Sequence, residues 1–346
     1  MDNRDSVQYN IGQLYRAVKR ELAALSDIWP GEAMLLCEHF LGVSDRAELL
    51  VRSEEAVSAE KAKALLDAAA QRAHRPLQYI LGEWHFDGMM LRVGEGVLVP
   101  REDTLTLVEL ACEKLSGMGL LKHPSQREGG RFVTLPQSPA ATAPSGRGPL
   151  KPISEREGIL QGSGGGSLGA ACRAPLRILD LCAGTGAVGL AVARRLPDAQ
   201  VICVELSEEA WPYLTANIEQ HGDGRVTALR GDVLAGPEAL GIAPGSFDAI
   251  LSNPPYIPAG DIPGLAREVR QEPVMALDGG EDGLVFYRAI ASLWKDALRG
   301  GGLVCMEHGE GQFEDIKRII VRCGWSDIGY KLDFSGKIRA INGTKM

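Results

Sequence analysis

The segment LRILDLCAGTG, residues 176–186, decides the fold of this chain. Its apolar first half predicts a short buried strand at 177–181, and the glycines after it predict a tight turn. A helical pattern of apolar residues begins at 187 and continues to about 196. A strand that enters a helix through a glycine-containing turn is the first unit of a doubly wound α/β sheet, so we expect a largely parallel sheet from here onward.

The rest of the C-terminal region continues this alternation of strand and helix. Further strands are expected at 200–205, 226–230, 247–252 and 303–307, and further helices at 208–220, 284–298 and 312–323. Strand-like pieces between 327 and 342 would supply a closing antiparallel pair. Residues 176–346 are therefore predicted to form one α/β domain.

The N-terminal part of the chain has a different organisation. Apolar residues at helical spacing over 11–25, 33–41 and from Ser58 to about 73 predict a small helical bundle over 1–75. Residues 76–116 read as a linker, with a β-hairpin between 79 and 100 and a helix over 104–115. Residues 117–175 are rich in Gly, Pro, Ser and Arg and lack hydrophobic periodicity. We predict that this stretch is a disordered insertion that loops out at the surface, with a partner-binding arm as the alternative.

Composition excludes several classes of protein. The formal net charge of -8 argues against a protein that depends on phosphate contacts, so we expect no direct nucleic-acid binding. The seven cysteines include no C-x-x-C pair, which predicts no metal centre and fits reduced thiols in a cytoplasmic protein. No apolar stretch reaches the roughly 18 residues that span a bilayer. We expect a monomer without membrane contact.

The turn at 182–186 predicts a ligand site. Ligands of α/β sheets bind at the carboxyl ends of strands, where glycines admit the ligand and a helix N-terminus offers free N–H groups. Gly184, Gly186 and Gly189 match the dinucleotide pattern G-x-G-x-x-G. However, the carboxylate of Asp180 is a poor neighbour for a pyrophosphate and suits an ammonium group. S-adenosyl-L-methionine (SAM) carries such an ammonium and NAD does not, so SAM is the predicted cofactor.

Two later strand ends carry further candidate cofactor residues. Glu205 ends the second predicted strand, where its carboxylate could accept both hydroxyls of a ribose. Asp232 and Val233 follow the third strand. Asp232 could accept a hydrogen bond from the adenine amino group, and Val233 could pack on the adenine ring.

The fourth predicted strand runs directly into Asn253-Pro254-Pro255-Tyr256. Two prolines cannot continue a central strand, because each lacks a donor N–H, but they stiffen the exit from it. A planar amide or aniline-like nitrogen is a poor nucleophile with two N–H groups. The Asn253 side-chain oxygen and the Pro254 carbonyl could accept from these groups, and Tyr256 could stack on the planar substrate. The tetrapeptide therefore predicts methylation of an sp2 nitrogen.

These two motifs together resemble the class I N-methyltransferases, and other segments resemble one branch of them. Residues 75–82 (RPLQYILG), 97–101 (VLVPR), 268–284 and 333–339 are similar to the release factor glutamine methyltransferases, the HemK/PrmC family. The resemblance implies a Rossmann-like, seven-stranded SAM-dependent core with a small N-terminal helical bundle that helps to hold the substrate protein. It also implies N5-methylation of the glutamine in the Gly-Gly-Gln motif of peptide chain release factors 1 and 2, with S-adenosyl-L-homocysteine as the other product.

Site residues follow from the same resemblance. It implies catalytic roles for Asn253, Pro254 and Tyr256 and substrate contacts along Asn253, Pro254, Pro255 and Tyr256. The implied cofactor contacts are Cys182, Ala183, Gly184, Thr185, Gly186, Glu205, Val233 and Asn253.

The chain departs from the family pattern at four positions, among them Ala183 and Thr185 where the family's turn has Thr and Ser, and two other functions stay open. The first glycine of the family's turn is Cys182 here, which would be strained if its φ is positive. Glu205 replaces a more usual Asp. The tetrapeptide would serve an adenine-N6 methyltransferase of DNA or RNA equally well, although such an enzyme should show a basic channel. A non-catalytic protein that binds SAM or a release factor is the third interpretation.

Overall fold

The computed structural model describes residues 9–25, 29–117 and 175–346 of the chain. The predicted insertion at 117–175 therefore falls almost entirely outside the described residues. Within the described C-terminal region, a mixed sheet has the strand order β5-β4-β3-β6-β7-β9-β8. Its strands are β3 (Leu176–Leu181), β4 (Ala199–Glu205), β5 (Val226–Arg230), β6 (Phe247–Ser252), β7 (Leu298–Glu307), β8 (Trp325–Leu332) and β9 (Ile338–Lys345).

The pairing of these strands confirms the predicted α/β class. β3 to β7 pair in parallel, and β9 lies antiparallel between β7 and β8 as the closing strand. β3 is central, with β4 on one side and β6 on the other. The chain reverses its direction of travel across the sheet at this pair, which is where α/β sheets bind ligands.

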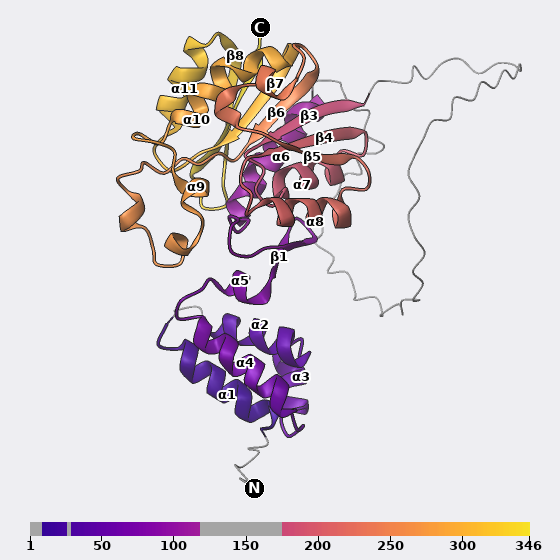
Figure 1. Ribbon diagram of the computed structural model, residues 1–346, viewed down its shortest axis with the longest axis vertical. Helices are drawn as coiled ribbons and strands as arrows, with labels where there is room; N and C mark the ends of the chain where they lie inside the picture. Colours follow the sequence, from indigo (N-terminus) through magenta and orange to yellow (C-terminus); the bar gives the residue numbers. More distant parts are fainter. Residues whose placement is uncertain (1–8, 26–28, 118–174) are drawn as a thin grey trace, which may run out of the picture. The chain divides into compact units, whose positions relative to one another are not determined.

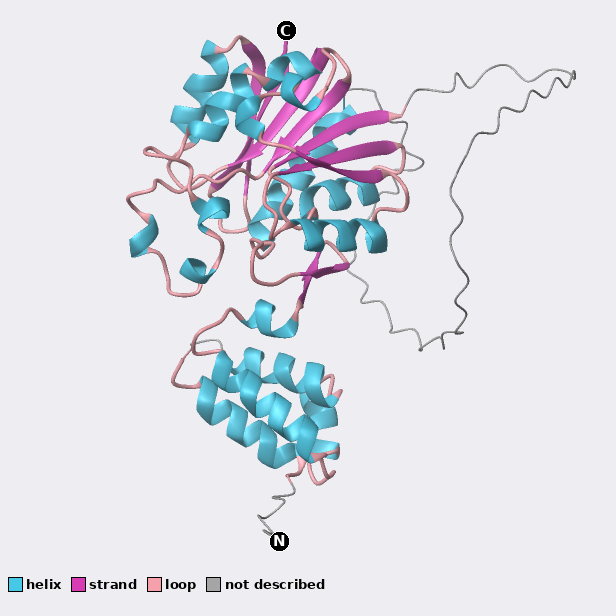
Figure 2. Cartoon of the chain, in the orientation of Figure 1, coloured by secondary structure: helices cyan, strands magenta, loops and turns pink. Residues whose placement is uncertain are grey.

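Helices cover both faces of the sheet (Figure 1). α6 (Leu105–Leu115), α7 (Ala187–Arg195) and α8 (Trp211–His221) pack on one face, and α10 (Val285–Ser292) and α11 (Phe313–Arg322) pack on the other. Alternate residues of the strands enter the two cores, as for Ile178 and Leu179 of β3. Figure 2 shows the resulting helix–sheet–helix layers.

One predicted helix is shorter than the sequence pattern indicates. A helix was expected over 284–298, but α10 ends at Ser292 and a short 3-10 turn covers Trp294–Ala297. The apolar spacing of Trp294 and Leu298 fits a helix, yet Leu298 instead pairs with Phe247 as the first residue of β7. Tertiary pairing thus overrides the local periodicity at this point.

The N-terminal region contains a separate hydrophobic core formed mainly by α1 (Ile11–Leu22), α2 (Trp29–Leu41) and α4 (Ala59–Gln71). Ser58 caps α4, as predicted, by accepting from the Lys61 backbone N–H at 3.3 Å. α1 begins with a capping box in which Asn10 and Gln13 exchange hydrogen bonds. The short helix α3 (Arg46–Val51) was not expected from the sequence, because six residues carry too little periodicity.

The linker contains a smaller hairpin than predicted. After the short helix α5 (Leu77–Leu81), β1 (Glu83–Phe86) and β2 (Met89–Arg92) pair around a turn at Asp87 and Gly88. Both turn residues have positive φ, as a two-residue hairpin requires. Two elements beyond the core sheet, the 3-10 turn η1 (Glu102–Thr104) and α9 (Val274–Leu277), border the site described below. No helix in the described part of the chain is long and apolar enough to cross a membrane.

Candidate active site

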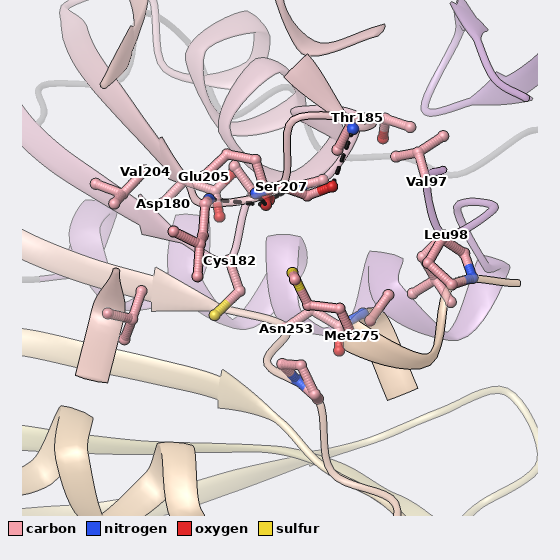
Figure 3. Close-up of a pocket in the computed structure, with 18 of the residues that line it drawn as sticks. Val97, Leu98, Asp180, Cys182, Thr185, Val204, Glu205, Ser207, Asn253 and Met275 are labelled. Carbon is pink, nitrogen blue, oxygen red and sulfur yellow. Dashed lines mark hydrogen bonds between the residues drawn. The ribbon is translucent and has the colours of Figure 1, made fainter. Parts of the chain in front are cut away.

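A cavity of about 460 Å³ opens at the carboxyl ends of β3, β4 and β6 (Figure 3). Its position at the reversal between β3 and β6 is the one expected for a ligand site. Its walls include nearly all the residues that sequence reasoning assigned to the cofactor: Asp180, Cys182, Ala183, Gly184, Thr185, Glu205, Asp232, Val233 and Asn253. Gly186 does not line the cavity; it is the N-cap of α7, with a φ of 81°.

The turn after β3 contains a cysteine with positive φ, the strained conformation that the sequence analysis considered for Cys182. Cys182 has a φ of 60° and Gly184 a φ of 55°, both in the left-handed region. A side chain there costs about 1–2 kcal/mol, so Cys182 is strained as expected for a cysteine at a glycine-like position. The turn is held by its surroundings, because the Ala183 N–H donates to the Val204 carbonyl at 3.1 Å.

Asp180 lies below this turn and is almost fully buried. Its Oδ2 accepts from the Gly189 N–H at 2.8 Å, and the Cys203 thiol lies 3.8 Å from the same oxygen. Burial raises the pKa of this carboxyl to about 7. Asp180 thus ties the first turn of α7 to the sheet and also faces the cavity as a group that titrates near neutrality.

Glu205 lies beside this turn and is held there by three backbone donors. Its Oε2 accepts from the Gly184 N–H at 2.7 Å, and its Oε1 accepts from the N–H groups of Leu206 and Ser207 at 2.8 and 2.7 Å. A carboxylate offers about four lone-pair sites, so about one stays free. Accepting two ribose hydroxyls would therefore require shared hydrogen bonds.

Asp232 and Val233 form the end of the cavity beyond β5. The Asp232 Oδ1 accepts from the Leu234 N–H at 2.8 Å and so caps the short 3-10 turn that contains Val233. Val233 is buried, and its carbonyl accepts from the Trp294 indole N–H at 2.7 Å. These contacts hold an apolar side chain beside an acidic one, as a site for a purine ring would need.

A second cavity, of about 480 Å³, lies on the other side of the tetrapeptide. Pro254 and Tyr256 line the second cavity, Pro255 lines the first, and Asn253 lines both. The predicted substrate residues therefore form the wall between two spaces. A group bound in one space and a group bound in the other would meet at Asn253.

The tetrapeptide is held rigidly on both sides. The Asn253 Nδ2 donates to the Thr104 hydroxyl at 3.2 Å, and the Tyr256 carbonyl accepts from the Gln312 side chain at 2.8 Å. A Cβ on Gly309 would lie only 3.1 Å from the Tyr256 ring, so glycine there lets the ring approach the backbone. Burial raises the pKa of the Tyr256 phenol to about 12, so it stays protonated near neutrality.

Several residues that border the cavities were not assigned to the site from sequence. Thr104 and Arg101 come from the linker, Met275 from α9 and Glu307 from the end of β7. The Arg101 guanidinium pairs with the buried Glu272 carboxylate, which joins the linker to the segment after the tetrapeptide. Residues 97–101 carry a resemblance to the family as their only sequence signal. Thr104 and Glu307 have no neighbouring motif that indicates a place in the site.

The first cavity fits SAM in both size and chemistry. Its volume lies in the range of about 300–1,000 Å³ that is typical of small-molecule sites. Figure 3 shows Asp180 and Glu205 on one side, Asn253 and Met275 across the pocket, and Val97 and Leu98 along a third wall. Carboxylates for polar groups and apolar side chains for a purine are thus present together, and the N-terminus of α7 is available for a carboxylate.

Comparisons with known families agree with this geometry. Residues 178–272 match the model of a methyltransferase domain, and residues 13–82 match that of the PrmC N-terminal domain. The two matches fall on the α/β sheet and on the helical region, respectively.

Curated proteins that are similar over most of the chain carry one name. A protein of Geobacter sulfurreducens named release factor glutamine methyltransferase is 34% identical over 301 residues, which covers 86% of this chain and 84% of that protein. Proteins of the same name from Gloeobacter violaceus and Thermodesulfovibrio yellowstonii are 32% and 30% identical. The shared length includes both the helical region and the α/β domain.

Proposed function

The chain belongs to the release factor glutamine methyltransferase family, and on that premise we propose that it methylates the N5 side-chain nitrogen of the glutamine in the Gly-Gly-Gln motif of release factors 1 and 2. The observation that carries this proposal is the position of Asn253, which lines both cavities. A methyl donor and an amide that entered from opposite sides would meet beside it.

The first cavity would hold SAM, which supplies a methyl group on a positively charged sulfonium. Asp180 would face its ammonium group, Glu205 its ribose and Val233 its adenine, with the backbone of 182–186 beside it. Gly186 would act indirectly, since it starts α7 without lining the cavity.

The second cavity would receive the glutamine side chain. Asn253 Oδ1 and the Pro254 carbonyl would accept the two amide N–H groups, which orients the nitrogen and raises electron density on it. The Pro254-Pro255 pair keeps these acceptors in place, because neither residue can rotate about φ. Tyr256 would cover the planar amide with its ring. The helical region 1–75 would contact the release factor outside the cavity.

Mass spectrometry of a release factor incubated with the protein and SAM tests this proposal. We expect the mass of one CH2 group to be gained on the Gly-Gly-Gln glutamine. A release factor with alanine in place of that glutamine is the matched control and should gain nothing. Methyl transfer to adenine in DNA or RNA, with none to the release factor, would instead support the adenine-N6 alternative and contradict our proposal.

A further inference from the structure

A buried polar chain links Asn253 to residues from two distant parts of the sequence. Thr104 ends the 3-10 turn of the linker, and Glu307 ends β7. The Thr104 hydroxyl accepts from the Asn253 Nδ2 at 3.2 Å. Thr104 also acts on the Glu307 carboxyl as a side-chain hydrogen-bond partner that lowers the pKa of this group against the larger effect of burial. Thr104 and Glu307 are 3% and 2% exposed, so both side chains are largely shielded from bulk solvent.

The donors and acceptors of this chain fix the orientation of the Asn253 amide. A hydroxyl has a single hydrogen, and an ionised carboxylate can only accept. When Glu307 is ionised, the Thr104 hydrogen points to it, and the Thr104 lone pair faces the amide NH2 of Asn253. Within the described residues, the Asn253 Oδ1 has no hydrogen-bond partner, so the oxygen is the end left for another donor.

The reversed amide would be unproductive. An asparagine side chain can turn end over end at little intrinsic cost, because its terminal torsion is broad and roughly two-fold. In the reversed orientation, the NH2 group would face the N–H groups of an incoming amide, and donor would meet donor. Only the orientation held through Thr104 gives the substrate nitrogen an acceptor.

The carboxyl group of Glu307 also has an oxygen that accepts no hydrogen bond within the described residues. Its Oε2 is buried without a hydrogen-bond partner in the described structure, and the side chain lines the second cavity beside Pro254 and Tyr256. Burial raises the pKa of Glu307 to about 7. The charged and titratable groups that act on it are Arg101, Asp103 and Arg339, with the phenols of Tyr256 and Tyr287 nearby.

We propose that Thr104 and Glu307 are positioning residues that hold the Asn253 amide with its oxygen toward the substrate nitrogen. The inference rests on the proposed function. Protonated Glu307 can donate to Thr104, which frees the Thr104 hydrogen to face Asn253 and favours the reversed amide. The methylation rate should therefore rise with pH through about 7, as Glu307 loses its proton.

Kinetics of three variants and one matched control test the proposal. Thr104→Val keeps the shape but removes the hydroxyl, and kcat should fall about tenfold to a hundredfold with little change in the Kd for SAM. Thr104→Ser should restore most of the rate. In Glu307→Gln, kcat should fall and lose its rise with pH. Thr106→Val is the control, because Thr106 is equally buried (3% exposed) yet lines neither cavity, and it should retain wild-type kcat.

A second measurement needs no substrate. The 15N–1H signal of the Asn253 side-chain amide, assigned by its loss in Asn253→Ala, should titrate with a midpoint near the Glu307 pKa of about 7. The signal should shift in Thr104→Val and stop titrating in Glu307→Gln. Wild-type kcat in Thr104→Val, or an amide signal indifferent to both substitutions, would overturn the positioning role. If the signal responds as expected but the protein methylates no release factor, the positioning role would stand and the proposed function would be wrong.

Discussion

The two halves of the site, the turn after β3 and the exit from β6, are built in opposite ways. The turn uses backbone groups: Cys182 and Gly184 adopt left-handed φ, and Glu205 is occupied by three N–H donors. The exit uses stiff prolines and one oriented side chain, Asn253, held by Thr104. In the function that we propose, the backbone-built turn would bind a ligand that is always the same, and the oriented Asn253 side chain would select the substrate nitrogen that reacts.

The turn is placed to bind the cofactor and the exit is placed to act in methyl transfer, so single substitutions in the two halves should affect different kinetic quantities. Changes in the turn should act on the affinity for SAM, and changes at the exit should act on kcat. A substitution that altered both quantities equally would show that the two halves do not work separately.

Asn253→Ala should have the largest effect. It removes the oxygen that we propose accepts the substrate N–H, and we expect kcat to fall by about 10²–10³-fold, the cost typical of losing one such preorganised group. The Kd for SAM, measured by calorimetry, should change only a few-fold. Turnover that survives in this variant would contradict our account of how the amide is oriented.

Glu205→Gln should have an intermediate effect, confined to binding. The new NH2 group cannot accept, so it opposes at least one of the three backbone N–H donors and leaves it unpaired. We expect a roughly tenfold to hundredfold increase in the Kd for SAM, with kcat at saturating SAM nearly unchanged. Glu205→Asp is the matched control, since it keeps the charge and should weaken binding less. A lower kcat with an unchanged Kd for SAM would mean that Glu205 acts in methyl transfer, and would contradict its assignment to cofactor binding.

Asp180→Asn should have the smallest effect, visible mainly in the pH dependence of binding. An ammonium is attracted to the ionised carboxylate, and the pKa of Asp180 is raised to about 7 by burial. The affinity of the wild-type protein for SAM should therefore increase as the pH rises through about 7, and this increase should disappear in the variant. The amide oxygen of the substituted side chain can still accept from the Gly189 N–H, which preserves the turn. Equal pH dependence in both proteins would mean that Asp180 has only its structural bond to Gly189.

Stability should respond to pH in the opposite direction. The raised pKa of Asp180 means that the folded protein retains a proton that the unfolded chain has lost. The stability contributed by this proton is present below the unfolded pKa and lost as the pH rises through about 7. Thermal melts without SAM, recorded against pH for wild type and Asp180→Asn, would measure the cost of the buried charge. The wild type should lose stability as the pH rises to about 7, and the variant should lack this loss.

Much of the fold was predictable because its signals are local. The strand at 226–230 and the strand at 247–252 were placed at their observed bounds, and the helix cap at Ser58 was identified from residue type alone. The start of α8 was predicted three residues early, at 208 instead of Trp211. Pro212 marks the true start, because proline is favoured in the first turn of a helix.

The sequence by itself determined the alternation of strands and helices in the α/β domain, the tetrapeptide Asn253–Tyr256 and the acidic residues at successive strand ends, since each depends on neighbours a few residues away. Only the tertiary structure decided which distant groups meet. It placed Asn253 in the walls of two cavities, took Gly186 off the cavity wall and brought Thr104 to hydrogen-bonding distance of a residue 149 positions later. The physical reason is that hydrophobic periodicity and turn preferences depend on residues only a few positions apart in the sequence. Buried hydrogen bonds between separate elements arise only when the whole sheet has closed around them.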